Sequence, residues 1–422
     1  MKEEFLHHVW KHQLWNTMDL NTINNETIIV KKIGQYNRNS GPDFLNSQII
    51  INEQLWVGNV EIHKKSSDWE KHKHQNDAAY NNVILHVVFR NDKKIFDNNL
   101  REIPTLETQG LISKSLLGKY NNLNLSKAKI PCNSFLKEID IAVFQDFSNQ
   151  LILERLEDKS KLLSEKMQVN KNDIEATFYS LICKSIGLKI NAQPMEILSE
   201  YLPFQLVRKH QHNIMQLTAL FFGVSGFLQD DFTEDYPQKL QVEFKYLKHK
   251  YNLKIMEKSL WKFLRLRPAS FPTIRLAQLV AIFSKYQNLV SLILEAKDKK
   301  ELKNIFTVTP DKYWDTHYTF DNISRKIEKK IGEKSIEIII INAVVPLLYF
   351  YEKKDSKIIQ NAIDFLKDIK AERNTITKKF SESGLPIKSA KNSQAIIQLY
   401  NNYCSLKKCL NCKLGKHILG NA

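Results

Sequence analysis

Residues 41–90 hold more groups capable of metal and acid–base chemistry than any other stretch of the sequence. They read GPDFLNSQIIINEQLWVGNVEIHKKSSDWEKHKHQNDAAYNNVILHVVFR. Asp43 and Glu61 supply carboxylates, and His63 and Lys65 follow Glu61 at alternate positions. Carboxylates and imidazoles hold divalent ions in proteins. This spacing therefore predicts a metal-dependent site, in which Lys65 stabilises developing negative charge.

Alternating apolar residues predict the strands that position these groups. Residues 44–51 and 55–63 each alternate, and the turn-forming residues Asn52 and Glu53 lie between them, which predicts a hairpin. Alternate residues of a strand share one face of its sheet. We therefore expect Glu61 and His63 to point to one side, with Lys65 close behind them.

The flanking residues predict the elements around this hairpin. Helical spacing covers residues 3–15, and a strand is expected over residues 27–33. Residues 83–89 form a further apolar run with His86 in its middle, after a short connection that contains His74. The predicted order is helix, three strands, a connection and a fourth strand.

This order and these residues resemble the PD-(D/E)XK nuclease superfamily. In that superfamily, an acidic residue near the start of the second core strand and a (D/E)xK motif on the next strand bind one or two Mg²⁺ ions. The resemblance implies a restriction-endonuclease-like mixed sheet, with Pro42 and Asp43 as the PD element, Glu61 as the second carboxylate and Glu4 as a third candidate acid. The lysine that orients water in the superfamily is replaced by His63.

The predicted chemistry is hydrolysis of a phosphodiester. A bound divalent ion neutralises the phosphate and acidifies a water molecule. Carboxylates favour Mg²⁺ or Mn²⁺, and histidines shift the preference toward Mn²⁺ or Zn²⁺. We expect Asp43 and Glu61 to bind the ion, His63 to ligate it or act as a base, and His74 or His86 to complete the shell. The alternative is a structural role for both carboxylates.

A cysteine cluster predicts a second metal site near the end of the sequence. Cys409 and Cys412 have the spacing that lets two thiolates reach one ion, and Cys404 is near enough to join them. With His417 as the fourth ligand, the site would hold Zn²⁺. With Cys132 instead, four thiolates would hold Zn²⁺ or an iron–sulfur cluster, as in some nucleases of the same superfamily.

Two further clusters are candidates for nucleic-acid contacts. Arg265, Arg267 and Arg275 surround two prolines, and the helix after the second proline would present free N–H groups near the guanidinium groups. These arginines predict a phosphate grip, with pairing to acids as the alternative. An aromatic patch could stack bases but is more typical of a core; it comprises Tyr313, Trp314, His317 and Tyr318.

Composition narrows the functional class. Lysine and arginine number 62 against 46 aspartate and glutamate residues, giving a net charge of +16. A positive surface favours phosphate polymers, so nucleic acid is the expected partner. The N-terminus lacks a secretory signal, and the odd number of cysteines favours a reducing, cytoplasmic location. Residues 336–351 are interrupted by polar residues and proline, so they predict a buried helix and no membrane span.

The remaining sequence is mainly helical. From about residue 139 the apolar spacing is three and four, and a long amphipathic helix is expected over residues 144–166. The predicted organisation is an α+β fold, with a nuclease-like domain over residues 1–126 and a mainly helical domain over residues 127–422.

Motifs along most of the chain resemble domain of unknown function 2851, an uncharacterised bacterial family. They include GPDF, GNVEIH, SDW, NNVILHVV, RLRPASFP and the terminal cysteine cluster. This resemblance implies a fold and no mechanism.

Three functions agree with these residues. The first is a metal-dependent nuclease, which would lose cleavage with the carboxylates. The second is a non-catalytic nucleic-acid-binding protein that has lost the superfamily's lysine, and the third is a hydrolase of a small substrate with a tightly held Zn²⁺. The sequence does not distinguish DNA from RNA and leaves the oligomeric state open.

Overall fold

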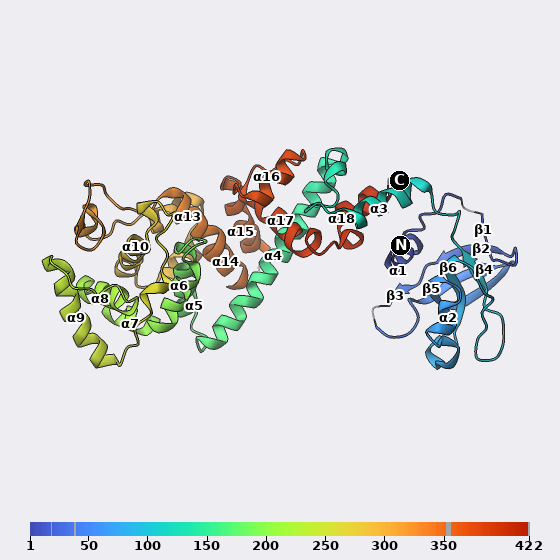
Figure 1. The fold of residues 1–422 in the computed structure, drawn as a ribbon, viewed down its shortest axis with the longest axis horizontal. Helices are drawn as coiled ribbons and strands as arrows, with labels where there is room; N and C mark the ends of the chain where they lie inside the picture. Colours follow the sequence, from blue (N-terminus) through green and yellow to red (C-terminus); the bar gives the residue numbers. More distant parts are fainter. Residues whose placement is uncertain (18, 38, 352–355, 421–422) are drawn as a thin grey trace. The chain divides into compact units, whose positions relative to one another are not determined.

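The chain forms two compact units in the computed structural model, which describes residues 1–17, 19–37, 39–351 and 356–420 (Figure 1). Unit 1 comprises Met1–Asn149, Asn374–Pro386 and Ile396–Ala422. Unit 2 comprises Gln150–Arg373 and Ile387–Ala395. This division differs from the predicted boundary at residue 126, because two late segments of the chain belong to unit 1. Unit 2 is therefore inserted into unit 1.

Unit 1 is built around a mixed sheet. The strand order is β1-β2-β4-β5-β6-β7, and short β3 also pairs with β4. The pairs are antiparallel as far as β5, and the β5–β6 and β6–β7 pairs are parallel. The strands are β1 (Leu20–Asn21), β2 (Thr27–Lys32), β3 (Gln35–Tyr36), β4 (Phe44–Ile51), β5 (Gln54–Lys65), β6 (Val83–Arg90) and β7 (Thr105–Glu107). The mixed α+β prediction is thus confirmed.

The hairpin of β4 and β5 follows directly from the sequence. Ile51 pairs with Gln54, and the two residues between them have positive φ angles, 48° at Asn52 and 71° at Glu53. Two left-handed residues match the right-handed twist of the strands, and asparagine tolerates this conformation well. The central strand β6 is buried along its first six residues, as expected of a strand with parallel neighbours.

Helices cover this sheet and connect its parallel strands. Helix α1 (Glu3–His12) buries Phe5, Leu6, Val9 and Trp10 and lies against β5 (Figure 1). The crossover from β5 to β6 contains short α2 (Asp68–Lys71) and the 3₁₀ turns η1 (His74–Asn76) and η2 (Ala78–Tyr80). This crossover carries the histidine pair of the HKH segment.

The rest of unit 1 is helical. It contains α3 (Lys114–Leu125), η3 (Asn133–Glu138), the first turns of α4 (Ile141–Val169), and α16 (Thr375–Glu382). The last segment contains the end of α17 (Ala390–Leu399), the π-helical η8 (Tyr400–Cys404), η9 (Cys409–Asn411) and α18 (Lys413–Gly420). Residues 95–105 form only a bridge between Phe96 and Glu102, and β7 forms the edge of the sheet.

Unit 2 is a helical body around one large apolar core. Asp173 caps α5, because its Oδ1 accepts a hydrogen bond from Ala176 N at 3.0 Å. A small hairpin of β8 (His317–Thr319) and β9 (Asn322–Ile323) is its only sheet among the described residues. The helices are α5 (Ile174–Ile186), α6 (Ala192–Tyr201), α7 (Phe204–His210), α8 (Ile214–Val224), α9 (Asp235–Tyr251), α10 (Pro272–Lys285), α11 (Leu289–Glu295), α12 (Lys299–Phe306), α13 (Glu333–Ile339), α14 (Val345–Tyr351) and α15 (Ser356–Asp368).

The apolar stretch at residues 333–351 is longer than the sequence indicated. Helices α13 and α14 continue through a π-helical turn, and together they reach the length and hydropathy of a membrane span. However, 67% of the 18-residue window is buried inside the protein, as in a core helix. A bent pair, α10 and α11, also passes the combined length test.

Candidate functional site

The structure brings Asp43 and Glu61 together at the end of the hairpin. Phe44 pairs with Val60, and this register sets Asp43 beside Glu61 on the neighbouring strand. The Asp43 amide donates to Glu61 Oε2 at 3.1 Å, and the Ile62 amide donates to Asp43 Oδ2 at 3.0 Å. Both carboxylates are therefore fixed by backbone groups.

Two predicted histidines join these carboxylates. His63 Nε2 lies 3.5 Å from Glu61 Oε1, and His74 Nε2 lies 3.4 Å from the same oxygen. His63 reaches this position through the alternation of β5, whereas His74 arrives from the crossover. Two predicted site residues, His63 and His74, therefore share one oxygen of Glu61 as a common neighbour.

His86 lies behind His63 and orients it. His86 is fully buried on β6, and its Nε2 lies 2.8 Å from Nδ1 of His63. If His63 donates from Nδ1, the lone pair of its Nε2 is directed toward Glu61. A hydrogen bond to the ring nitrogen that does not bind the metal sets the tautomer of a metal-binding histidine. His86 was expected to be a metal ligand, but its contact with Nδ1 of His63 places it behind that residue instead.

His72 is a neighbour that the prediction of ligands left out. Its Nδ1 lies 3.1 Å from Nε2 of His63. His63, His72 and His74 each offer a nitrogen, and these atoms all lie within 4.8 Å of one another. The signal was the HKH spacing in the crossover, which places both imidazoles at the end of β5.

Helix α1 contributes a different acid from the one expected. Glu4 is exposed and acts electrostatically on Tyr120, so its candidacy is not supported by its position. Glu3 instead interacts with Asp43, and His7 Nε2 lies 3.2 Å from Asp43 Oδ2. Glu3 and His7 are four residues apart and therefore share one face of the helix, whereas Glu4 is turned away from it. That spacing was the available signal.

Lys65 does not reach the carboxylates. Its side chain is exposed, and Nζ lies 3.8 Å from Oδ2 of Asp92. Strand alternation was the basis of the prediction, but Lys65 is the last residue of β5 and lies beyond the buried part of the strand. Lys64, its neighbour, interacts electrostatically with Glu3.

Burial dominates the electrostatics of the site. Burial, and then the Asp43 charge, raises the pKa of Glu61 to about 9. Burial, and then neighbouring imidazoles, lowers the pKa of His63 to about 2 and that of His74 to about 4. For His86, burial and then His74 lower the pKa to about 3. These three imidazoles are therefore neutral at pH 7 and retain the lone pairs that a metal requires.

The donor set fits a divalent metal ion. Among the ion pairs of the described residues, those of Asp43 and Glu61 are with histidines, and lysine and arginine take no part. Two adjoining carboxylates without a fixed positive neighbour are a strong cation site. The mixed oxygen and imidazole donors suit Mn²⁺ or Zn²⁺ better than Mg²⁺.

Comparison with known proteins assigns the chain to a family. The model for proteins described as "Protein of unknown function (DUF2851)" matches residues 3–375. The chain belongs to the DUF2851 family. The match includes the whole carboxylate and histidine site but ends before the cysteines at 404–412, which had been included in the family resemblance. No curated protein and no solved structure matches the chain.

The predicted phosphate grip of this DUF2851 protein is divided between surface and core. Arg265 and Arg267 are exposed, whereas Arg275 is 5% exposed. Arg275 donates from Nη1 to Gln278 Oε1 at 2.9 Å, and burial lowers its pKa to about 10. Its place in the first turns of α10 points the guanidinium inward. Arg275 therefore supports the fold, and phosphate binding stays a prediction for the other two arginines.

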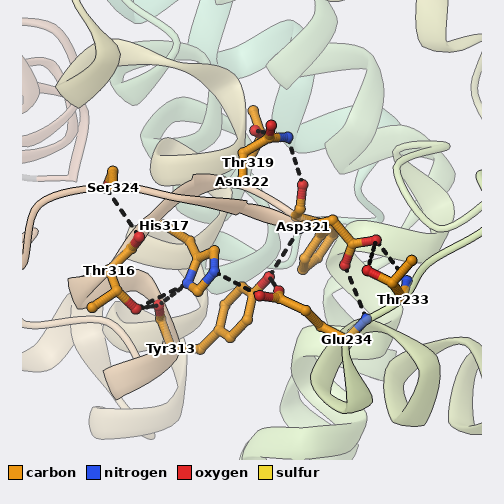
Figure 2. Close-up of polar contacts among 10 residues, drawn as sticks. Thr233, Glu234, Tyr313, Thr316, His317, Thr319, Asp321, Asn322 and Ser324 are labelled. Atoms are coloured by element: carbon orange, nitrogen blue, oxygen red, sulfur yellow. Dashed lines mark hydrogen bonds and ion pairs between the residues drawn. The ribbon is translucent and has the colours of Figure 1, made fainter.

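The aromatic patch lies partly in the interior, because Trp314 and His317 are buried and Tyr313 and Tyr318 are half-buried. Trp314 is 1% exposed and stacks on Phe222. Figure 2 shows that Tyr313 and His317 both point at Glu234, with His317 Nε2 3.0 Å from Oε1 of Glu234. Base stacking would require these rings to be exposed. The patch instead joins the β8–β9 hairpin to the start of α9.

The four cysteines predicted to bind metal are all in unit 1. Cys132, Cys404 and Cys412 are buried, Cys409 is half-buried, and all are free thiols. Cys183 is a core residue of α5, as expected.

Proposed function

We propose that this DUF2851 protein is a metal-dependent phosphodiesterase that cleaves nucleic acid. The observation that carries the proposal is that His63 and His74 both lie at Oε1 of Glu61, while the Asp43 amide donates to Oε2 of the same carboxylate. Lysine and arginine are not among the ion-pair partners of these residues in the described chain. The net charge of +16 supports a polyanionic substrate.

Some residues of the site would bind the metal ion, and others would hold those ligands in position. Asp43, Glu61 and His74 would hold the ion, and His63 would complete the shell through Nε2. When bound, the ion neutralises phosphate charge and acidifies water. His86 holds the His63 ring in place, and the two backbone amides fix the carboxylates before substrate arrives. His7 lies beside Asp43 and would transfer a proton there.

Cleavage assays with matched variants test this proposal. Purified full-length protein is incubated with labelled single- and double-stranded DNA and RNA, with Mg²⁺, Mn²⁺, Zn²⁺ or EDTA. We expect EDTA to abolish cleavage. We expect Glu61→Gln to reduce cleavage on the order of 100-fold or more, since substitution of a metal ligand lowers activity at least as much as substitution of a residue that only holds a ligand in place. Glu4→Gln, the same change outside the site, retains full activity. Cleavage that survives Glu61→Gln would overturn the proposal.

A non-catalytic nucleic-acid-binding protein is the second candidate. The observation that favours it is the replacement of the superfamily's lysine by His63, with Lys65 turned to solvent. The same assays distinguish it, because it predicts binding that survives Glu61→Gln, no cleavage with any ion, and affinity that falls steeply with salt as fewer counterions are released.

A further inference from the structure

Four cysteines from two distant parts of the sequence converge in unit 1. The Cys132 thiol interacts electrostatically with the thiols of Cys409 and Cys412, and the Cys404 thiol interacts with all three others. Such interactions require the sulfur atoms to be near one another. Because three of the four are buried and none forms a disulfide, the cluster is a set of free thiols enclosed by protein.

The loop around Cys412 is shaped for a thiolate. The N–H groups of Leu414 and Gly415 donate to the Cys412 sulfur, and the Cys412 amide donates to the Cys409 carbonyl at 3.2 Å. A Cβ at Gly415 would collide with the Cys409 carbonyl oxygen, so only glycine lets α18 begin this close to η9. Amide groups directed at sulfur stabilise a negative ligand.

Two polar contacts hold segments that flank the cysteines within unit 1. Lys119 Nζ on α3 donates to the Ile418 carbonyl on α18 at 3.3 Å. Ser383, after α16, donates to the Asn133 side chain, directly after Cys132. Both segments are therefore anchored in the packing of unit 1.

The spacing of the sulfurs distinguishes between metal groups. Four thiolates at the Zn–S distance in a tetrahedron are about 3.8 Å apart. Among the described residues, the group of three ligand atoms within 4.8 Å of one another is the histidine group; no three of these cysteine sulfurs meet that limit. The cysteine sulfurs are thus more widely spaced than the ligands of a single zinc ion, as the ligands of a multinuclear cluster are.

We propose that Cys132, Cys404, Cys409 and Cys412 bind an iron–sulfur cluster. Four thiolates are the usual ligands of such clusters. Each thiol gives up its proton when it binds. The cluster stands apart from the proposed phosphodiesterase chemistry, since none of its ligands contacts Asp43 or Glu61 in the hydrogen bonds and ion pairs of the described chain.

The cluster would cross-link two parts of unit 1 that are far apart in the sequence. Cys132 lies before Asn149, where the chain first leaves unit 1, and the other three cysteines follow Ile396, where the chain enters unit 1 for the last time. Its role is to hold these two segments of unit 1 together.

Metal analysis of the full chain tests the proposal. The protein is produced with added iron, purified without oxygen, and analysed for iron, zinc, acid-labile sulfide and visible absorbance. We expect iron and sulfide in similar amounts with a broad visible absorbance. Cys132→Ser and Cys409→Ser should lose most of both, whereas Cys183→Ser, the same change at the fifth cysteine, should retain them.

Metal analysis of the wild-type protein tests the proposal even if a variant fails to fold. Zinc without sulfide would overturn the iron–sulfur assignment, and a chain without bound metal after reconstitution with iron and sulfide would overturn the site itself. Iron that persists in Cys132→Ser would show that Cys132 is not a ligand and would overturn the four-cysteine assignment. Far-UV circular dichroism of each variant separates loss of the cluster from loss of the fold.

Discussion

The chemistry of the site depends on how burial acts on single side chains. His63 and His86 lie in contact on adjacent parallel strands, and both are 2% exposed or less. In that environment an imidazolium has no solvent to stabilise it, so both rings stay neutral far below their usual pKa. The same burial favours the protonated form of Glu61. Neutral ligands and a desolvated carboxylate make a site that a cation can stabilise.

Acid should destabilise the protein through these histidines. In the unfolded chain each ring titrates near 6.5, whereas in the folded chain the pKa of His63 is about 2 and that of His86 is about 3. Below pH 6.5 the unfolded state therefore binds more protons, and each histidine lowers the unfolding free energy by about 1.4 kcal/mol per pH unit. Urea unfolding between pH 6.5 and pH 4.5 measures this slope. A stability independent of pH in this window would contradict the buried neutral pair.

Glu61 should produce the opposite slope in metal-free protein, over a pH range that overlaps that of the histidines and extends above it. Its pKa is raised from 4.5 to about 9, so between these values the folded state holds the extra proton and stability falls as pH rises. Metal binding must expel that proton. Calorimetry in two buffers of different ionisation enthalpy should therefore report proton release at pH 7 in the wild type and less in Glu61→Gln. Equal release in both proteins would rule out Glu61 as the source.

Candidate residues of the hairpin, of β6 and of the crossover between them were predictable from their types, whereas His7 and Glu3 on α1 were not. Asp43, Glu61 and His63 follow from a hairpin whose register is local. His7 enters from α1, and the sequence does not specify how that helix packs on the sheet. The position of Lys65 was not predicted for a related reason. Alternation predicts which face of the sheet a residue lies on, but it does not predict where the buried part of a strand ends.

At the scale of elements, close approach between β5 and β6 depends on Gly58. An added Cβ would lie 2.6 Å from the carbonyl oxygen of Asn82 and would overlap the Ile84 side chain. The strands around it align Glu61 with His86. Gly58 therefore contributes to the geometry of the site from three residues away.

Substitution of Gly58 should destabilise the sheet. Gly58→Ala forces the two strands apart, and overpacking of this kind costs about 1–3 kcal/mol. Gly118→Ala in α3 is the matched control, because no atom lies within 4 Å of its Cβ position and alanine favours a helix by about 1 kcal/mol. Thermal unfolding should show opposite signs for the two variants. The same sign in both would contradict the packing argument.

Local patterns predicted elements better than boundaries between them. β4 was predicted with its observed bounds, because its alternation and its turn agree. The long helix α4 runs from Ile141 to Val169, beyond the predicted 144–166 at both ends. Helix ends depend on caps and on neighbours, so apolar spacing alone underestimates them.

At the scale of the whole molecule, the order of the sequence and the order of the units differ. Composition and periodicity predicted the change from sheet to helix, and the structure confirms it. They did not predict that residues 374–386 and 396–422 belong with the sheet-containing unit. That membership comes from long-range packing, such as the contact of α18 with α3, which leaves no local trace in the sequence.

Removal of the last segment should affect the first unit selectively. A chain that ends at Ala395 retains all of unit 2 but loses the segment of unit 1 that begins at Ile396. We expect amide exchange to accelerate in α3 and in the segment around Cys132, while α5 and α8 remain protected. Hydrogen exchange with peptide resolution measures both units in one sample. Unchanged protection around Cys132 would show that the last segment does not stabilise unit 1.

The insertion also sets the timing of assembly on the ribosome. The strands of unit 1 are synthesised first, but the segment of unit 1 that begins at Ile396 emerges only after the whole of unit 2. At ordinary rates of synthesis this interval is on the order of tens of seconds. Through that time unit 2 can fold completely, whereas unit 1 waits with apolar helix faces uncovered. The nascent chain is thus most exposed to aggregation and chaperone capture at its oldest end.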